Sequence, residues 1–115
     1  MFTVAIPIFQ SRISPVLDVC SRILLISLEQ NREIDRKEIY LDDLSLSERT
    51  SVLKRSNITT IICGGISDVF YNILNGLGID VIVGKVGEVE EVLAAFQSGR
   101  LEEESFDMPG FRSKK

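Results

Sequence analysis

Residues 58–68, Ile-Thr-Thr-Ile-Ile-Cys-Gly-Gly-Ile-Ser-Asp, combine the features of a strand, a turn and a helix start. The β-branched residues at the beginning are typical of a buried strand. Gly64 and Gly65 permit backbone angles, and a close ligand approach, that other residues do not. Ser67 or the residue after it can cap a helix whose first amides point toward whatever lies above Cys63. This layout predicts a binding site, and the alternative is a plain βα turn with a buried cysteine.

Apolar periodicity extends the prediction on both sides of this stretch. Strands are expected at residues 2–9, 22–29, 32–41, 58–63 and 79–83, and helices at residues 45 or 47 to 55, 68–77 and 87–98. Gln30 and Asn31 suit a two-residue hairpin turn, because asparagine tolerates positive φ. The order βββαβαβα predicts an α/β fold with a mixed five-stranded sheet, in which an antiparallel hairpin precedes parallel strands joined by right-handed crossovers.

The length of 115 residues fits one domain with one core. We expect residues 1–101 to form that domain, because no linker or internal repeat interrupts them. Residues 102–115 begin with three glutamates, continue through Met108-Pro109-Gly110-Phe111 and end with basic residues. That composition predicts a charged and mobile C-terminal tail.

The formal net charge of −4 argues against a nucleic-acid partner, since such proteins carry a basic face that neutralises phosphates. No apolar run reaches the length of about eighteen residues that a membrane span needs. The N-terminus lacks the basic and apolar regions of a secretory signal. We therefore expect a cytoplasmic protein without a membrane partner.

The absence of histidine excludes Ser-His-Asp and Cys-His catalysis. Asp18 is the only acid in the loop after the first strand, so the converging carboxylates of a two-metal nuclease are missing. Cys20 and Cys63 lie 43 positions apart without a CxxC pair, which indicates neither a disulfide framework nor a zinc finger. An enzyme that handles a phosphorylated small molecule is the last alternative, because only the thiols could act as nucleophiles. We expect a protein that is not an enzyme.

Three loops are expected to meet at the carboxyl ends of the parallel strands, where ligands of such sheets bind. These loops comprise residues 10–21, 64–68 and 84–87, and two helix starts would point N–H groups at the same place. The candidate contacts for an anion or another ligand are Arg12, Ser14, Gly64, Gly65, Ser67 and Lys85. The run Gly84-Lys85-Val86-Gly87 lacks the spacing of a phosphate loop, so a βα turn is the alternative there.

Both cysteines lie in or beside these loops. Thiolates are soft ligands for iron–sulfur and related clusters, so Cys20 and Cys63 are the candidate metal ligands. Two thiolates are too few for an ordinary four-cysteine cluster. Solvent, carboxylates or a second copy of the chain would supply the remaining ligands, which makes a homodimer a candidate assembly. The alternative is that Cys20 packs on the sheet as a small hydrophobe.

Three segments carry a resemblance to a known family. They are Arg12-Ile13-Ser14-Pro15-Val16-Leu17-Asp18, then Ile62-Cys63-Gly64-Gly65-Ile66, then Gly78-Ile79-Asp80-Val81-Ile82 with Val89-Glu90-Glu91-Val92-Leu93 and the residues up to Leu101. In these segments the chain resembles the dinitrogenase iron-molybdenum cofactor family, which includes NifX, NafY and the C-terminal part of the cofactor-synthesis enzyme NifB. The resemblance covers residues 2–101.

The resemblance implies a ribonuclease H-like three-layer fold. It also implies binding of iron–molybdenum cofactor or an iron–sulfur cluster, in a carrier or storage role. One branch of the family uses a histidine as a ligand, and this chain has no histidine. We therefore expect a small non-catalytic protein accessory to metallocluster assembly, with the metallocluster and its protein donor or acceptor as partners. The alternative is a metal-free interaction or regulatory module that docks through its tail.

Overall fold

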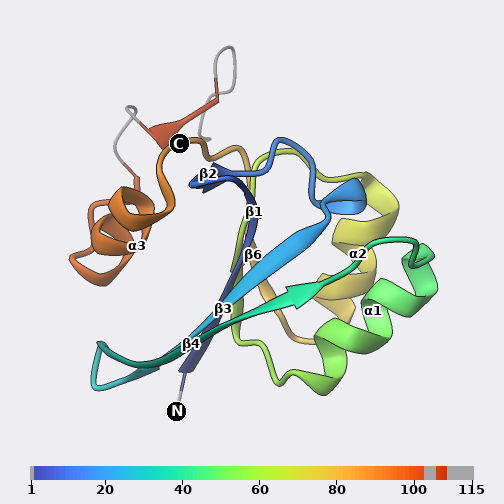
Figure 1. Cartoon of the computed structure of the whole chain (residues 1–115), viewed down its shortest axis with the longest axis horizontal. Coiled ribbons are helices and arrows are strands. Elements are labelled where there is room, and N and C mark those ends of the chain that lie inside the picture. Colours follow the sequence, from blue (N-terminus) through green and yellow to red (C-terminus); the bar gives the residue numbers. More distant parts are fainter. Residues whose placement is uncertain (1, 103–105, 109–115) are drawn as a thin grey trace.

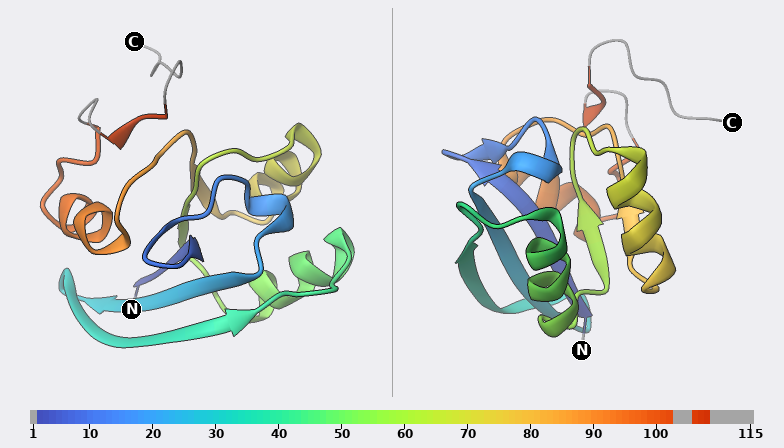
Figure 2. Two further views of the ribbon diagram at one scale, coloured as in Figure 1. Left: turned by 45° about the horizontal axis from the view of Figure 1, so that its top comes forward. Right: turned by 90° about the vertical axis from the view of Figure 1, so that its right-hand side faces the viewer.

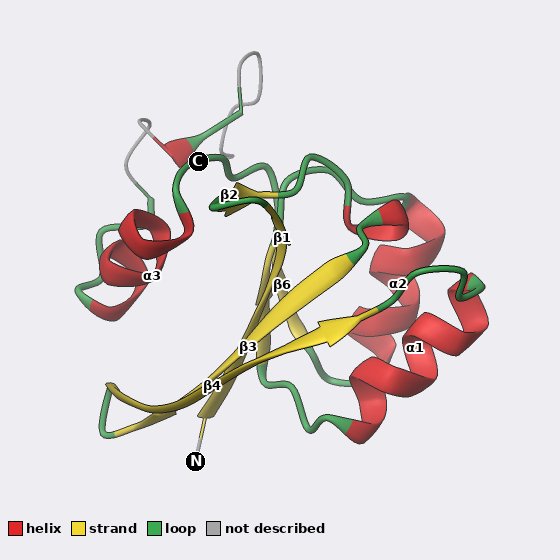
Figure 3. Ribbon diagram, in the orientation of Figure 1, coloured by secondary structure: helices red, strands yellow, loops and turns green. Residues whose placement is uncertain are grey.

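The computed structural model describes residues 2–102 and 106–108 as one mixed sheet with helices on both faces (Figure 1). The strands are β1 (Phe2–Phe9), β2 (Arg12–Ile13), β3 (Arg22–Glu29), β4 (Arg32–Tyr40), β5 (Thr60–Ile62) and β6 (Asp80–Ile82). The helices are α1 (Leu46–Arg55), α2 (Asp68–Gly76) and α3 (Val89–Gln97), and a short 3-10 turn, η1 (Leu17–Val19), lies between β2 and β3. Figure 3 shows the same elements coloured by type.

The sheet has the order β4-β3-β1-β5-β6, and β2 pairs with the end of β1. β1, β3 and β4 form antiparallel pairs, whereas β5 is parallel to both β1 and β6. The structure confirms the predicted mixed α/β sheet and adds β2 as a sixth strand. Periodicity does not reveal β2, because it has two residues and pairs with Ile8 and Phe9 across a turn at Gln10, whose φ is 58°.

The hairpin between β3 and β4 has the predicted two-residue turn. Gln30 and Asn31 have φ values of 53° and 65°, so both occupy the left-handed region that favours a tight hairpin. This turn sets the antiparallel pairing beside it, in which Glu29 pairs with Arg32, and the register then shifts between Ser27 and Leu28. The predicted bounds of β1 and β3 agree with the structure.

Helices α1 and α2 cover one face of the sheet and α3 covers the other (Figures 1 and 2). Alternation along β1 sends Val4 and Ile6 into the hydrophobic cluster beneath α3, and sends Ala5 into the cluster beneath α1 and α2. Leu53 of α1 and Leu74 of α2 are 0% exposed in the second cluster, and burial of each contributes about 2 kcal/mol. The fold therefore has three layers.

Serine caps fix the starts of α1 and α2, as the sequence predicts. Ser45 Oγ accepts a hydrogen bond from the Glu48 N–H at 3.1 Å, and the Glu48 carboxylate accepts one from the Ser45 N–H at 2.8 Å. Ser67 Oγ accepts a hydrogen bond from the Phe70 N–H at 3.1 Å. Helix α2 thus begins three residues after the glycine turn that follows β5.

Residues 106–108 of the predicted tail lie against the loop after β6, and we call these three residues the strap. The Val86 N–H donates to the carbonyl of Phe106 at 2.7 Å, and the Met108 N–H donates to the carbonyl of Gly84 at 2.8 Å. The strap therefore adds a short antiparallel bridge at the edge of the sheet.

Leu101 is buried in the cluster beneath α3, so the chain up to this residue contributes to the core. Residues 109–111, which complete the Met-Pro-Gly-Phe run of the predicted tail, lie outside the described residues. Within residues 2–102 and 106–108, no helix is both long and apolar enough to cross a bilayer.

Candidate functional site

Backbone hydrogen bonds join the loops of residues 10–21, 64–68 and 84–87 into one surface, which we call the rim. Gly65 donates its N–H to the carbonyl of Pro15 at 2.7 Å and accepts from the N–H of Leu17 at 2.9 Å. The Gly84 N–H donates to the carbonyl of Gly64 at 2.8 Å. The structure therefore brings together the three loops that the sequence predicts to meet.

Gly64 has no room for a side chain. A Cβ atom at this position would lie 2.7 Å from the carbonyl oxygen of Pro15 and 3.3 Å from that of Ser14. Carbon and oxygen atoms do not approach this closely without contact strain, so the backbone would have to move. Contact between two rim loops is by itself a sufficient reason for glycine at position 64.

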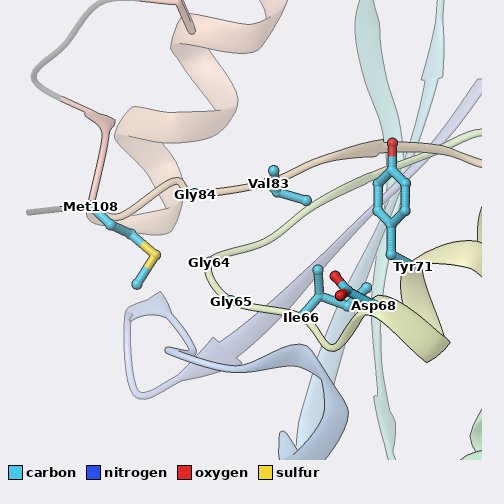
Figure 4. Close-up of a pocket in the computed structure, with 8 residues that line it drawn as sticks. All are labelled: Gly64, Gly65, Ile66, Asp68, Tyr71, Val83, Gly84 and Met108. Atoms are coloured by element: carbon cyan, nitrogen blue, oxygen red, sulfur yellow. The ribbon is translucent and has the colours of Figure 1, made fainter. Parts of the chain in front are cut away.

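A pocket of about 360 Å³ opens on the rim between the turn after β5, the start of α2 and the loop after β6 (Figure 4). Met108 of the strap lies at one side in Figure 4, and Tyr71 of α2 lies at the other, with Asp68 below it and beside Ile66. The pocket is mainly apolar, and its lining consists of Gly64, Gly65, Ile66, Asp68, Tyr71, Val83, Gly84 and Met108. Its volume lies within the range of about 300–1,000 Å³ that is usual for small-molecule sites.

Of the predicted ligand contacts, Gly64 and Gly65 line this pocket. The two predicted cations, Arg12 and Lys85, are instead paired with carboxylates. Arg12 Nη1 lies 3.0 Å from Glu88 Oε2, and Lys85 Nζ lies 2.7 Å from Asp107 Oδ1. These carboxylates are 76 and 22 positions away in the sequence, so local spacing gave no sign of them.

Glu88 precedes α3 and receives hydrogen bonds from two residues of the first rim loop. Bonds from the Ser11 hydroxyl and from the Arg12 guanidinium hold the pKa of this carboxyl below its ordinary value. Glu88 therefore stays charged and offsets the charge of Arg12 at neutral pH.

The start of α2 is likewise occupied by a group of the chain itself. The Asp18 carboxylate accepts hydrogen bonds from both the N–H and the hydroxyl of Ser67. An internal carboxylate thus fills the position at which we expected an external anion. Ser14 is buried and donates its backbone N–H to the carbonyl of Pro7, so it supports the loop.

Cys20 and Cys63 lie in the cluster beneath α1 and α2 and are 2% and 0% exposed. Burial raises the pKa of Cys63 from 9.0 to about 12, and the negative charge of Asp18 adds to the shift. Burial also raises the pKa of Cys20, although the charge of Arg49 opposes this. Both residues are protonated thiols at neutral pH, and neither lines the pocket. Metal ligation by the two cysteines stays a prediction.

The sequence did not single out Tyr71, Val83 or Met108 as parts of a site. Tyr71 follows Asp68 by three positions and therefore shares its helix face, which is a signal that periodicity could have used. Met108 reaches the pocket only because the strap folds back, and no local pattern indicates that. Within the described part of the chain, no group of three or more Cys, Asp or Glu side chains could hold a metal ion.

A family model described as dinitrogenase iron-molybdenum cofactor matches residues 1–99. Among curated proteins, MJ0580 of Methanocaldococcus jannaschii is 27% identical over 108 residues, which cover 89% of this chain and 91% of that protein. The match to the family model extends over the rim loops and all three layers of the fold.

Solved structures share the fold. The crystal structure of PH0822 has a TM-score of 0.81 at 20% identity, and the match covers 86% of this chain and 91% of PH0822. The crystal structure of MJ0327 from M. jannaschii has a TM-score of 0.73 at 24% identity, and the match covers 85% of this chain and 89% of MJ0327. The apo form of the orange protein from Desulfovibrio gigas has a TM-score of 0.72 at 14% identity, and the match covers 99% of this chain and 98% of the orange protein.

Proposed function

Since the chain belongs to the dinitrogenase iron-molybdenum cofactor family, we propose that it binds and carries a cluster of the iron–molybdenum or iron–sulfur type. The cluster is cargo in this proposal, and the protein is an accessory to metallocluster assembly and not a catalyst. Its partners are the proteins that donate the cluster or accept it.

The pocket beside Gly64 and Gly65 is the observation that carries this proposal. It lies at the carboxyl ends of β5 and β6, where sheets of this kind bind their ligands. Its mainly apolar lining suits a compact, sulfur-rich cargo. Asp68 and Tyr71 on the lining are exposed, so the pocket can be reached from solvent.

Two side chains of the pocket carry atoms that can serve as metal ligands. The thioether of Met108 is a soft donor of the kind that suits sulfur-bound metals, and the Asp68 carboxylate is a hard one. The hydroxyl of Tyr71 is available as a hydrogen-bond donor. So few donors give weak and reversible binding, which fits a carrier better than a permanent cluster site.

Ligation by the two cysteines is the second version of this proposal. It requires the turn after β5 to open, because Cys63 is fully buried below the pocket lining. It also requires deprotonation of a thiol whose pKa is about 12. Both costs favour the version in which the cargo sits in the pocket.

Anaerobic titration with tetrathiomolybdate, and separate reconstitution with iron and sulfide, test the proposal through visible absorption that stays with the protein. For the reconstitution with iron and sulfide, the pocket version predicts about tenfold weaker binding in an Asp68→Asn/Met108→Leu variant, because two ligand atoms for iron are lost. A Cys20→Ala/Cys63→Ala variant should bind as the wild type does. Asp42→Asn removes one exposed acid elsewhere and serves as the matched control.

The outcomes separate the two versions. Loss of absorption in the cysteine variant alone would assign the cargo to the thiols. Absence of bound absorption in the wild-type protein, together with no iron or molybdenum in anaerobically purified material, would refute cluster binding altogether.

A metal-free interaction module is the second candidate function. Val19 of η1 and Val69 of α2 are 73% and 62% exposed, and the contact between Asp18 and Ser67 brings their segments together. Exposed apolar side chains that gather on one surface often mark an interface.

The role of the tail in such docking can be tested by removing residues 109–115. A longer deletion would also remove Leu101 and the strap, which pack against the domain. Pull-downs and light scattering should show a lost partner or a lost homodimer if the tail docks. If the full chain and the chain without residues 109–115 recover the same amount of partner, docking through the tail is contradicted.

A further inference from the structure

Lys85 is a buried lysine whose partner belongs to the strap. Its side chain is 3% exposed, that of Asp107 is 9% exposed, and their charged atoms lie 2.7 Å apart. Lysine is almost never this buried without a partner, because an unpaired ammonium loses its hydration. Asp107 is therefore the group that allows Lys85 to remain beneath the strap.

The strap is also a wall of the pocket. Met108 lines the pocket and donates its N–H to the carbonyl of Gly84, which lines the pocket too. Asp107 and Lys85 are the immediate neighbours of these two residues in the chain. A movement of the strap that separates Asp107 from Lys85 and breaks the hydrogen bond from Met108 to Gly84 would displace Met108 and open the pocket on that side.

The strap has few attachments besides the ion pair. Its described backbone contacts are the hydrogen bonds from Val86 to Phe106 and from Met108 to Gly84, and the ring of Phe106 packs beside the cluster under α3. Segments held by so few contacts open locally at a free-energy cost far below that of global unfolding. The buried ion pair is the strongest single contact that holds this segment closed.

We propose that the pair Lys85–Asp107 is a latch that holds Met108 in place at the side of the pocket and so controls how fast cargo enters and leaves. The proposal rests on the function proposed above. A carrier must retain its cargo between donor and acceptor and must also release it. A strap closed by one ion pair meets both needs, because a partner protein that draws Asp107 away opens the pocket.

Amide hydrogen exchange by NMR tests the latch in the cargo-free protein. In Asp107→Asn, the amides of Met108 and Val86 should exchange at least about tenfold faster, because a charge-assisted contact that closes the strap is lost. The amide of Gly84 donates to Gly64 and not to the strap, so its exchange should not change. Asp80→Asn, which removes an exposed acid at the other end of β6, is the matched control.

A compensating variant separates the latch from a simple charge effect. Replacement of a buried ion pair by apolar side chains often preserves stability, so Lys85→Met/Asp107→Leu should restore slow exchange at Met108. If Lys85 mattered only as a cation that attracts an anionic cargo, this double variant would bind cargo poorly.

The rate at which tetrathiomolybdate leaves the protein, measured by stopped flow, then tests whether the latch controls release. We expect release about tenfold faster from Asp107→Asn than from the wild type, and near-wild-type release from Lys85→Met/Asp107→Leu. Equal release rates in all three proteins would overturn the latch while leaving cluster binding intact. The latch would also be overturned if the Met108 amide exchanged equally fast in Asp107→Asn and in the wild type, or if Asp107→Asn also made the Gly84 amide exchange faster. Absence of any binding to the wild type would remove the proposed function and the gating role together.

Discussion

Arg49 Nη1 in α1 lies 2.6 Å from the carbonyl oxygen of Cys20, and Arg49 Nε donates to the carbonyl of Leu44 at 3.1 Å. The arginine is 7% exposed, so a buried charged group fastens the loop before β3 to the first helix. Asp18 lies in the same loop, two residues before Cys20. The position of this part of the rim therefore depends on a residue that does not itself belong to the rim.

Replacement of Arg49 by methionine should lower the free energy of unfolding by about 2–3 kcal/mol, because one buried and one partly buried carbonyl group lose a charged donor. The pKa of Cys20 should rise further, since the charge of Arg49 lowers it. Urea denaturation and thiol titration measure the two effects. Arg55→Met at the exposed end of α1 is the control, and equal stability of the two variants would contradict the assignment.

Gly64→Ala and Gly76→Ala should change stability in opposite directions. A Cβ at position 64 would lie 2.7 Å from the Pro15 carbonyl oxygen, so we expect a loss of about 1–3 kcal/mol. A Cβ at position 76 would meet nothing within 4 Å, and alanine in the last turn of α2 should add about 0.5–1 kcal/mol. Thermal and urea denaturation report both values. A stable Gly64→Ala protein would show that the rim loops are not in contact as described.

The stability of the protein should fall between pH 9 and pH 12. The thiol of Cys63 has its pKa raised from 9.0 to about 12 by burial, so the unfolded chain loses this proton at lower pH than the folded one does. Stability is therefore fully present below pH 9 and decreases as the pH rises toward 12, by about 1.4 kcal/mol per pH unit. The comparison is with Cys63→Ala, which lacks this thiol and keeps the rest of the sequence. Parallel pH profiles for the two proteins would argue against the raised pKa.

Asp18→Asn should destabilise the start of α2. Asp18 accepts from the Ser67 N–H at 2.9 Å and from the Ser67 hydroxyl at 2.6 Å, and its charge lies at the positive end of the helix. The contact is exposed, so the expected loss is only about 1 kcal/mol. The pKa of Cys63 should fall at the same time, because the charge of Asp18 raises it. A stability change without a pKa change would place Asp18 farther from the thiol.

Much of the fold could be predicted because it rests on local patterns. The bounds of β1 and β3 follow from dense apolar runs, and the β3–β4 turn follows from Gln30 and Asn31. The caps of α1 and α2 follow from serines placed before amphipathic segments. Each of these features is encoded within about ten residues of the place where it appears.

The site was harder to predict because its contacts join distant segments. Lys85 looked like a free cation, and Asp107, its partner, stood in a segment with the composition of a tail. The helix start at Ser67 looked like an anion site, and Asp18 fills it from 49 positions away. Periodicity and spacing place such residues on elements, but they do not show which charges neutralise each other.

The position of β1 in the sheet has a consequence for how the chain folds as it is made. β1 is made before its partners, and its antiparallel partner β3 follows within the next 20 residues or so. Its parallel partner β5 pairs Val4 with Thr60 and Ala5 with Ile61, so one edge of β1 stays open until the chain has been synthesised beyond Ile61. Contacts this distant in sequence slow folding. The β1–β3–β4 half can therefore form early as a template, and the half that carries the pocket is completed last.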